Sequence, residues 1–220
     1  MDQNVEEQII EGFHPFFGKT DLEIFRLLNV PPSVSKHRMY LLAMAILRTR
    51  QVEVEEFEKA EIQVKTIRLE PDGSPTESMS FRQIQFREIV TEEWETSVWH
   101  HILTRRFLFV VFRRDGKEEF SLERVLFWTM PVTDLATARD FWNDTKRKIT
   151  RNDFIHFIKE SDDRICHVRP KARDSTDLME TANGGLEKKK CYWLNAKYIR
   201  SILANSEKSI RKVRVIKRVA

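Results

Sequence analysis

The sequence contains few cysteines and few glycines, the residues that form disulfide bonds and glycine-rich binding loops. Only two cysteines, Cys166 and Cys191, and six glycines occur among its 220 residues. Two cysteines without paired spacing exclude a disulfide scaffold and provide no zinc motif, so we expect a reduced, intracellular compartment. Neither G-x-G-x-x-G, the complete P-loop pattern G-x-x-x-x-G-K-S/T nor G-x-S-x-G occurs. The sequence therefore has no Rossmann, P-loop or hydrolase nucleophile signature.

A long apolar run is also missing. The longest, from Tyr40 to Leu47, is far too short to span a bilayer, and the acidic stretch MDQNVEEQIIEGF at the N-terminus has no signal-peptide core. We therefore expect a cytoplasmic protein without a membrane partner. Hydrophobic residues make up 41% of the chain and charged residues 33%, which is the composition of an ordinary globular domain with a sizeable core.

Charge is distributed unevenly along the chain. Residues 164–220 contain 15 Lys and Arg against 5 Asp and Glu, whereas the first 163 residues contain 23 against 29. The resulting charges are +10 and −6. Such an excess is typical of a surface that binds a polyanion, most often nucleic acid, although a solvated basic face explains the charge equally well.

Hydrophobic spacing predicts an α/β (α+β) fold with a mixed sheet. At its centre we expect Phe107–Phe112, a continuous apolar run typical of a strand buried on both faces. Thr20 and Glu23 form a capping box that starts a helix, and a turn at Pro71–Pro75 joins two strands in an expected hairpin. The other expected elements are helices at 35–48 (capped by Ser35), 88–103, 133–148 and 195–204, strands at 62–69, 79–86, 124–130, 165–168 and 192–194, and a loop at 174–190.

One stretch, Glu55 to Lys65, carries a nuclease-like pattern. Gln63 and Lys65 are two residues apart on an expected strand, so both side chains line the same face. In many Mg²⁺-dependent nucleases a carboxylate stands two residues before such a lysine, and a second carboxylate upstream helps to hold the metal. The amide of Gln63 is a weak ligand for a hard cation. Taken alone, the pattern also arises by chance in any strand with a surface lysine.

The segment EEFEKAEIQVKTI, residues 55–67, resembles the active-site segment of MutH mismatch-repair nucleases and of GATC-cutting type II restriction endonucleases of the Sau-three-A kind. The family's pattern is Asp, six residues, Glu, one residue and Lys, and the matching positions here are Glu56, Gln63 and Lys65. The first departs conservatively, the second disables the metal site and the third matches. The resemblance implies a restriction endonuclease-like, MutH-like fold, with a mixed central sheet flanked by helices.

The stretch VRPKA, residues 168–172, resembles the loop with which MutH-like enzymes contact bases in the DNA groove. The resemblance implies that Arg169 bonds guanine O6 and N7 and that Pro170 holds the loop in shape. Lys171 and Arg173 would contact phosphates. An ordinary solvated basic turn is the alternative. Three further lysines are candidates for phosphate contacts: Lys188, Lys189 and Lys190.

Trp193 stands where the family places a tyrosine near the adenine of the site. An indole donates one hydrogen bond but has no hydroxyl, so adenine-methylation sensing need not carry over. Packing in the core is an equally good interpretation of Trp193. The adjacent His100 and His101 do not share a helix face, so we expect no metal site there.

The resemblance covers nearly the whole chain and implies one MutH-like DNA-binding domain over residues 1–220. Within it we expect N-terminal helices at 1–50, a central sheet with the degenerate nuclease motif at 51–163, and a basic DNA-recognition part at 164–220. The chain would be a fragment of a two-domain enzyme, with Mg²⁺ in the parent enzyme and no cofactor in this domain. Its implied partners are double-stranded DNA containing GATC and the catalytic MutH-like domain of the same enzyme.

The sequence leaves three functions open. The first is an allosteric DNA-binding domain of a restriction endonuclease, without catalysis of its own. The second is an active Mg²⁺-dependent endonuclease in which Glu58 or Glu61 replaces the missing carboxylate. The third is a protein-interaction domain that kept the fold and lost DNA binding. Cleavage with Mg²⁺ separates the second from the first, and DNA binding at low salt separates the third.

Overall fold

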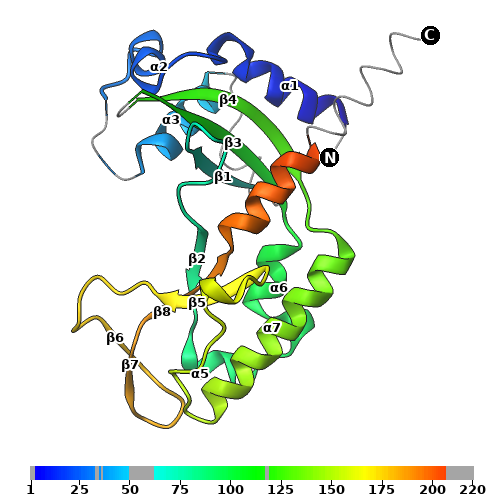
Figure 1. Cartoon of the computed structure of the whole chain (residues 1–220), viewed down its shortest axis with the longest axis vertical. Coiled ribbons are helices and arrows are strands. Elements are labelled where there is room, and N and C mark those ends of the chain that lie inside the picture. The colour runs from blue at the N-terminus through cyan, green and yellow to red at the C-terminus, as the bar shows by residue number, and fades with distance from the viewer. Residues whose placement is uncertain (1–2, 33–34, 36, 50–61, 117–118, 207–220) are drawn as a thin grey trace. The chain divides into compact units, whose positions relative to one another are not determined.

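A computed structural model describes residues 3–32, 35, 37–49, 62–116 and 119–206 (Figure 1). The chain divides into two compact units, each assembled from two stretches of sequence. Unit 1 comprises Met1–Thr76 and Thr104–Thr129, and unit 2 comprises Glu77–Leu103 and Met130–Ala220. Each unit has its own sheet and its own helices.

Unit 1 is built around the sheet β1–β3–β4. This sheet is mixed, because β1 pairs with β3 in parallel and β3 pairs with β4 antiparallel. The elements of unit 1 are α1 (Gln3–Phe13), the 3-10 turn η1 (His14–Phe16), α2 (Asp21–Leu27), α3 (Arg38–Arg48), β1 (Ile62–Leu69), β3 (Arg106–Asp115) and β4 (Glu119–Trp128).

The central strand β3 confirms the prediction for Phe107–Phe112, since all six of these side chains are fully buried. Successive side chains point to opposite faces of a strand. Leu108, Val110 and Phe112 therefore share one face, and they belong to the core formed with helices α1, α2 and α3. On the other face, Phe109 stacks on Trp128 of β4, with 5.5 Å between the ring centroids.

The helices of unit 1 begin partly as predicted. In the capping box of α2, Thr20 Oγ1 accepts from the Glu23 amide (3.3 Å) and the Glu23 carboxylate accepts from the Thr20 amide (2.8 Å). The prediction of a cap at Ser35 is wrong, because α3 begins at Arg38. Ser35 Oγ instead accepts from the His37 amide (3.1 Å) and closes a turn before the helix.

Unit 2 is built around the antiparallel sheet β2–β8–β5, with a separate two-stranded hairpin, β6–β7. Residues 196–206 form its last helix. The other elements are β2 (Met79–Gln83), α5 (Phe86–Ile89), the 3-10 turn η2 (Trp94–Thr96), α6 (Val98–Leu103), α7 (Val132–Thr150), the 3-10 turn η3 (Glu160–Asp162), β5 (Cys166–Pro170), β6 (Leu178–Glu180), β7 (Leu186–Lys188) and β8 (Lys190–Leu194).

One face of the sheet β2–β8–β5 packs on the helices of its own unit. Tyr192 of β8 stacks on Trp99 of α6, with ring centroids 4.6 Å apart, and Phe141 of α7 contacts the edge of the same tyrosine. Phe81 of β2 packs against Trp99 as well. This face therefore supplies the core of unit 2, and the residues between these aromatics along each strand point to the opposite face.

The expected hairpin of strands 62–69 and 79–86 is wrong. The turn between them forms, since the Glu70 amide donates to Ser74 O (2.8 Å) and Gly73 has the positive φ of 82° that glycine adopts readily. One bridge, Leu69 to Pro75, follows the turn. The Thr76 amide then donates to Arg68 O at 2.9 Å. Beyond this point the two strands take other partners, β1 pairing with β3 and β2 with β8.

The single helix predicted at 88–103 is also wrong. The segment contains α5, η2 and α6, separated by bends. Thr91, Thr96 and Ser97 donate their hydroxyl hydrogens to backbone carbonyls three residues upstream. Such local bonds compete with the helical ladder, and Ser97 Oγ accepts from the His100 amide at the start of α6. Hydroxyl side chains thus divide a stretch whose apolar spacing favours one helix.

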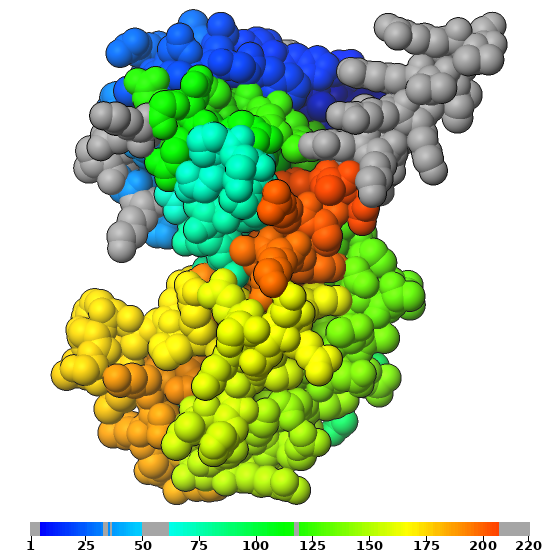
Figure 2. Space-filling model, in the orientation of Figure 1, coloured from blue at the N-terminus to red at the C-terminus, as the bar shows by residue number. Residues whose placement is uncertain are grey.

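The stretch expected as a loop at 174–190 contains the hairpin β6–β7, in which Leu178 pairs with Lys188. Its strands were missed because their apolar residues are few and Leu186 is 65% exposed. Asn183 and the two glycines after it form the turn, with Gly184 at a φ of 80°. In Figure 2 this part of unit 2 is the yellow and orange projection on the surface.

The fold class is confirmed as a mixed α/β fold with a mixed sheet and flanking helices. Within the described part of the chain, every helix is too short or too polar to cross a bilayer. The two units do not follow the consecutive stretches 1–50, 51–163 and 164–220, because each unit draws on two separated segments. The functional division of the chain into those stretches stays a prediction.

Candidate nucleic-acid interface

The second face of the sheet β2–β8–β5 carries polar, cationic and aromatic side chains. In register, Ser80 of β2 pairs with Trp193 of β8, which pairs with His167 of β5. Arg169, two residues after His167, pairs with Cys191 and points to the same face. The core-facing Tyr192 lies between them and points away. We call this surface the cationic face; its members are Ser80, Gln83, His167, Arg169, Lys171 and Trp193.

Arg169 is the best-defined cation of this face. Its guanidinium carbon lies 4.0 Å from the centroid of the Trp193 ring, which is within cation–π range. Arg169 Nη1 donates to Glu160 Oε2 at 2.9 Å. The side chain is 39% exposed. The planar fork is therefore oriented by a ring on one side and a carboxylate at one nitrogen, while part of it faces solvent.

Lys171 lies next along the same face. Its Nζ donates to Ser80 Oγ (2.8 Å) and lies 5.7 Å from the Trp193 centroid. The Lys171 amide donates to Lys189 O, which extends the pairing of β5 beyond Pro170. Gln83 Nε2 donates to the Lys171 carbonyl (3.4 Å). Arg169 and Lys171 thus share one indole ring and form a compact cationic pair.

Trp193 is only 7% exposed, so it is part of the packed structure. The His167 ring lies parallel to it, with 6.1 Å between centroids and 13° between planes. No described residue accepts a hydrogen bond from Trp193 Nε1. The burial agrees with the packing interpretation, and this indole supports the two cations of the face. A place of Trp193 near an adenine stays a prediction.

His167 is fully buried beneath the cationic face. Neither ring nitrogen has a hydrogen-bond partner among the described residues. Burial lowers the pKa of His167; the Glu160 carboxylate opposes this shift and Arg169 adds to it. The imidazole is therefore held neutral near physiological pH, where it adds no charge to the face.

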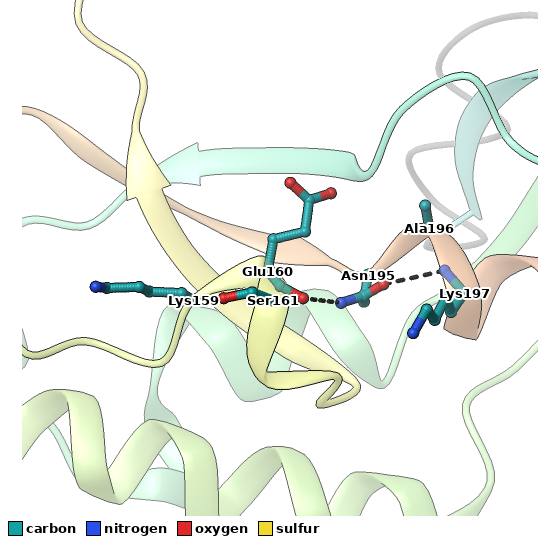
Figure 3. Close-up of a pocket in the computed structure, with 6 residues that line it drawn as sticks. All are labelled: Lys159, Glu160, Ser161, Asn195, Ala196 and Lys197. Atoms are coloured by element: carbon teal, nitrogen blue, oxygen red, sulfur yellow. Dashed lines mark hydrogen bonds between the residues drawn. The ribbon is translucent and has the colours of Figure 1, made fainter.

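Glu160 is the acidic member of the neighbourhood. Its carboxylate accepts from Ser78 Oγ and from Arg169 Nη1. The Ser78 hydrogen bond is the main cause that lowers the pKa of Glu160, and the positive charge of Arg169 lowers it further. The residue lines an open hollow of about 630 Å³ with Lys159, Ser161, Asn195, Ala196 and Lys197 (Figure 3).

The remaining predicted DNA-binding residues fall into three situations. Pro170, Arg173 and Lys188 are exposed. Arg173 Nε contacts Asp174 at 3.1 Å, and Lys189 is paired with Asp177. Lys190 is only 7% exposed and points to the core side of β8, where its ammonium lies 5.9 Å from the Phe154 centroid. Strand alternation explains this placement, which does not suit Lys190 to a direct phosphate contact.

The nuclease-like motif lies in unit 1, on β1. Gln63 and Lys65 pair with Phe107 and Phe109 of β3, so the two side chains share one face as predicted. Gln63 Oε1 is buried and has no hydrogen-bond partner among the described residues. Glu56, Glu58 and Glu61 lie outside the described residues.

The described part of the motif does not fit a Mg²⁺ site. The amide of Gln63 replaces one of the two carboxylates that a hard divalent ion prefers, and the other carboxylate position, Glu56, lies outside the described residues. The described residues contain no group of three His, Cys, Asp or Glu side chains that could hold a metal. We therefore derive no metal-dependent step from these residues, and the absence of a cofactor from this domain stays a prediction.

Four members of this neighbourhood were missed from the sequence: Ser80, Gln83, His167 and Glu160. Alternation could have found His167, because it stands two residues before Arg169 on one strand. Ser80 required the knowledge that β2 pairs with β8 across more than a hundred residues. Glu160 lies in a short 3-10 turn, and no sequence signal connects it with Arg169.

Unit 1 thus carries a nuclease-like strand, and unit 2 carries a cationic sheet face. The family model described as DNA mismatch repair enzyme MutH matches residues 48–140. The chain is 29% identical over 226 residues to the type II restriction enzyme Sau3AI of Staphylococcus aureus. These two matches support a MutH-like restriction endonuclease domain in this chain.

The extent of these matches limits which properties of the relative and of the family can be transferred to this chain. The alignment with the Staphylococcus aureus enzyme covers 88% of this chain and 46% of that protein, so the chain spans about half the length of the relative. The family-model match includes β1 and its motif, whereas Arg169, which lies on strand β5 and not in the expected loop, is beyond it.

Proposed function

We propose that this chain is a DNA-binding domain that recognises GATC in double-stranded DNA and does not cleave it alone. The observation that carries the proposal is the Arg169 guanidinium seated on Trp193 with Lys171 beside it. An arginine fork matches guanine O6 and N7, which makes Arg169 the candidate for base reading. The relative's identity as a type II restriction enzyme favours DNA as the ligand.

Phosphate contacts would come from the exposed cations around Arg169. Lys171, Arg173 and Lys188 suit this role, and Lys189 suits it once its ion pair with Asp177 opens. Residues 207–220 add six Lys and Arg against one Glu, so about half of the basic excess of the C-terminal part lies outside the described residues. Contacts of this kind bind any DNA sequence and weaken with salt.

The proposed loss of cleavage rests on Gln63. Replacement of a metal-binding carboxylate by an amide removes one negative charge from the position that would hold Mg²⁺. The domain would then serve as an allosteric effector toward a catalytic MutH-like domain in the same protein, with Mg²⁺ bound there. In such a protein, an added GATC duplex should stimulate cutting of a plasmid with a single GATC site, and Arg169→Ala should abolish the stimulation.

A gel-shift titration with a GATC duplex and a scrambled duplex tests the DNA-binding proposal directly. We expect tighter binding to GATC, and for both duplexes a log affinity that falls by about 0.9 per phosphate contact for each unit of log salt. Equal affinity for the two duplexes would overturn GATC recognition. An absence of binding at low salt would favour a protein-interaction domain, and Mg²⁺-dependent cutting would favour an active nuclease.

A further inference from the structure

We propose that Glu160 is a positioning residue for base recognition. It holds the Arg169 guanidinium against the Trp193 ring before DNA arrives. This inference rests on the proposed GATC recognition. It assigns a role in that recognition to Glu160, which lies outside the nuclease-like motif.

Arg169 is held by two contacts of different chemistry. The Trp193 ring lies 4.0 Å below the guanidinium carbon and fixes the plane in which the fork lies. Glu160 Oε2 accepts a hydrogen bond from Arg169 Nη1 at 2.9 Å, and this bond fixes the rotation of the guanidinium over the ring. An arginine side chain has several rotatable bonds, so either contact alone leaves freedom that the two together remove.

Glu160 is itself anchored at both its side chain and its backbone. Ser78 Oγ donates to Oε1, and the same Oγ accepts from the Ala196 amide at 3.0 Å. Asn195 Nδ2 donates to the Glu160 carbonyl at 3.0 Å, as Figure 3 shows, while the carboxylate extends away from this contact. The carboxylate is thus presented to Arg169 by a supported framework. Changes of the Glu160 side chain leave the bond from Asn195 intact.

The exposure of the Arg169–Glu160 ion pair indicates whether the pair acts on folding stability or on side-chain conformation. Arg169 is 39% and Glu160 44% exposed, and an ion pair this exposed adds little to folding stability. Its effect is on conformation, since a recognition side chain that is ordered in advance loses less entropy on binding. Variants at Glu160 should therefore fold normally and change recognition.

A carboxylate beside DNA also repels phosphates, and this effect acts in the opposite direction. Removal of the negative charge alone raises the affinity for every duplex, whatever its sequence. Loss of positioning lowers the affinity for GATC and leaves the scrambled duplex unaffected. The ratio of the two affinities therefore isolates positioning from charge.

The experiment compares Glu160→Ala, Glu160→Gln and the control Asp163→Asn with the unchanged chain in the same gel-shift titration. The two Glu160 variants lose the same charge, but glutamine retains an oxygen that accepts from Arg169. Asp163 is an exposed neighbour paired with Lys197, and its φ of 55° is tolerated by asparagine. Asp163→Asn thus removes one charge from the same turn without touching Arg169.

We expect Glu160→Ala to lower the GATC-to-scrambled ratio by about fivefold or more, the lower range of a bidentate guanine contact. Its affinity for the scrambled duplex should stay equal or rise. Glu160→Gln should keep most of the ratio, and Asp163→Asn should keep all of it. An unchanged ratio in Glu160→Ala overturns the inference while GATC recognition stands. If the unchanged chain has no GATC preference, the proposed function fails and the inference fails with it.

Discussion

The sheets of the two units differ in what they bury. In unit 1 the central strand β3 is buried on both faces from Phe107 to Phe112, so these six side chains serve packing. In unit 2 the central strand β8 is packed on one face by Trp99 and Phe141 and on the other presents Trp193 to Arg169 and Lys171. A sheet that packs on helices at one face can present polar and charged side chains in register on the other, whereas a strand with apolar side chains on both faces cannot.

The same comparison separates what the two units retain of a nuclease-like site. Unit 1 keeps the strand and the lysine of the motif but holds an amide at Gln63. Unit 2 keeps a supported cationic face around Arg169. On the proposed function, unit 2 would supply the side chains that recognise DNA, whereas β1 of unit 1 has an amide in place of one metal-binding carboxylate.

We expect the largest effect, a loss of folding stability, from a cavity in the core of unit 1. Phe109→Ala removes a fully buried ring that stacks on Trp128, and a cavity of this kind costs about 3–5 kcal/mol. Urea unfolding measures the change, with Leu186→Ala, at a 65% exposed position, as the control that should change the free energy of unfolding by less than about 0.5 kcal/mol. A small effect of Phe109→Ala would mean that β3 is not the packed centre described above.

The next effect concerns base reading by unit 2. Arg169→Ala should bring GATC affinity toward that of a scrambled duplex, because a bidentate guanine contact contributes about 1–3 kcal/mol of discrimination. Lys171→Ala also removes one positive charge beside the Trp193 ring, and it should weaken binding to both duplexes by similar factors. Fluorescence anisotropy with labelled duplexes measures both. If Arg169→Ala weakens both duplexes equally, Arg169 contacts phosphate instead of a base.

Sequence reasoning succeeded where local chemistry decides the structure. The capping box at Thr20 and the buried run Phe107–Phe112 are both set by neighbouring residues, and both are confirmed. The pairing of β2 with β8 was not predictable, because a strand of five residues is compatible with many partners until the whole unit assembles. The hairpin predicted for it followed from proximity in sequence, whereas its partner β8 lies more than a hundred residues away.

The candidate site was predictable in part for the same reason. Arg169, Lys171 and Trp193 were singled out, and the structure places them together. Lys190 was grouped with its neighbours by charge, although alternation along β8 turns it into the core. Glu160 depends on a tertiary contact between a 3-10 turn and β5, which periodicity does not encode.

A smaller effect should appear when the pH is lowered. Burial lowers the pKa of His167 in the folded chain below the value of about 6.5 that it has when unfolded. The unfolded state therefore binds the proton more readily, so the stability from His167 is present above about pH 6.5 and is lost as the pH falls through the folded pKa. Urea midpoints at pH 7.5 and pH 5.5 should differ, and the difference should shrink in His167→Gln. Equal shrinkage in the exposed His156→Gln would contradict the assignment.

The smallest expected effect is the absence of cleavage. With Mg²⁺ present, a plasmid containing GATC should remain intact with this chain alone, because Gln63 supplies no charge to a hard divalent ion. Gln63→Glu places a carboxylate two residues before Lys65 on the same face of β1, which makes it the matched variant for any gain of metal-dependent activity. Agarose electrophoresis of the plasmid measures both. Specific fragments that the unchanged chain produces and Lys65→Ala does not would show that another carboxylate, such as Glu58 or Glu61, completes the site. Unit 1 would then be catalytically active, and the contrast with the DNA-binding unit 2 would fail.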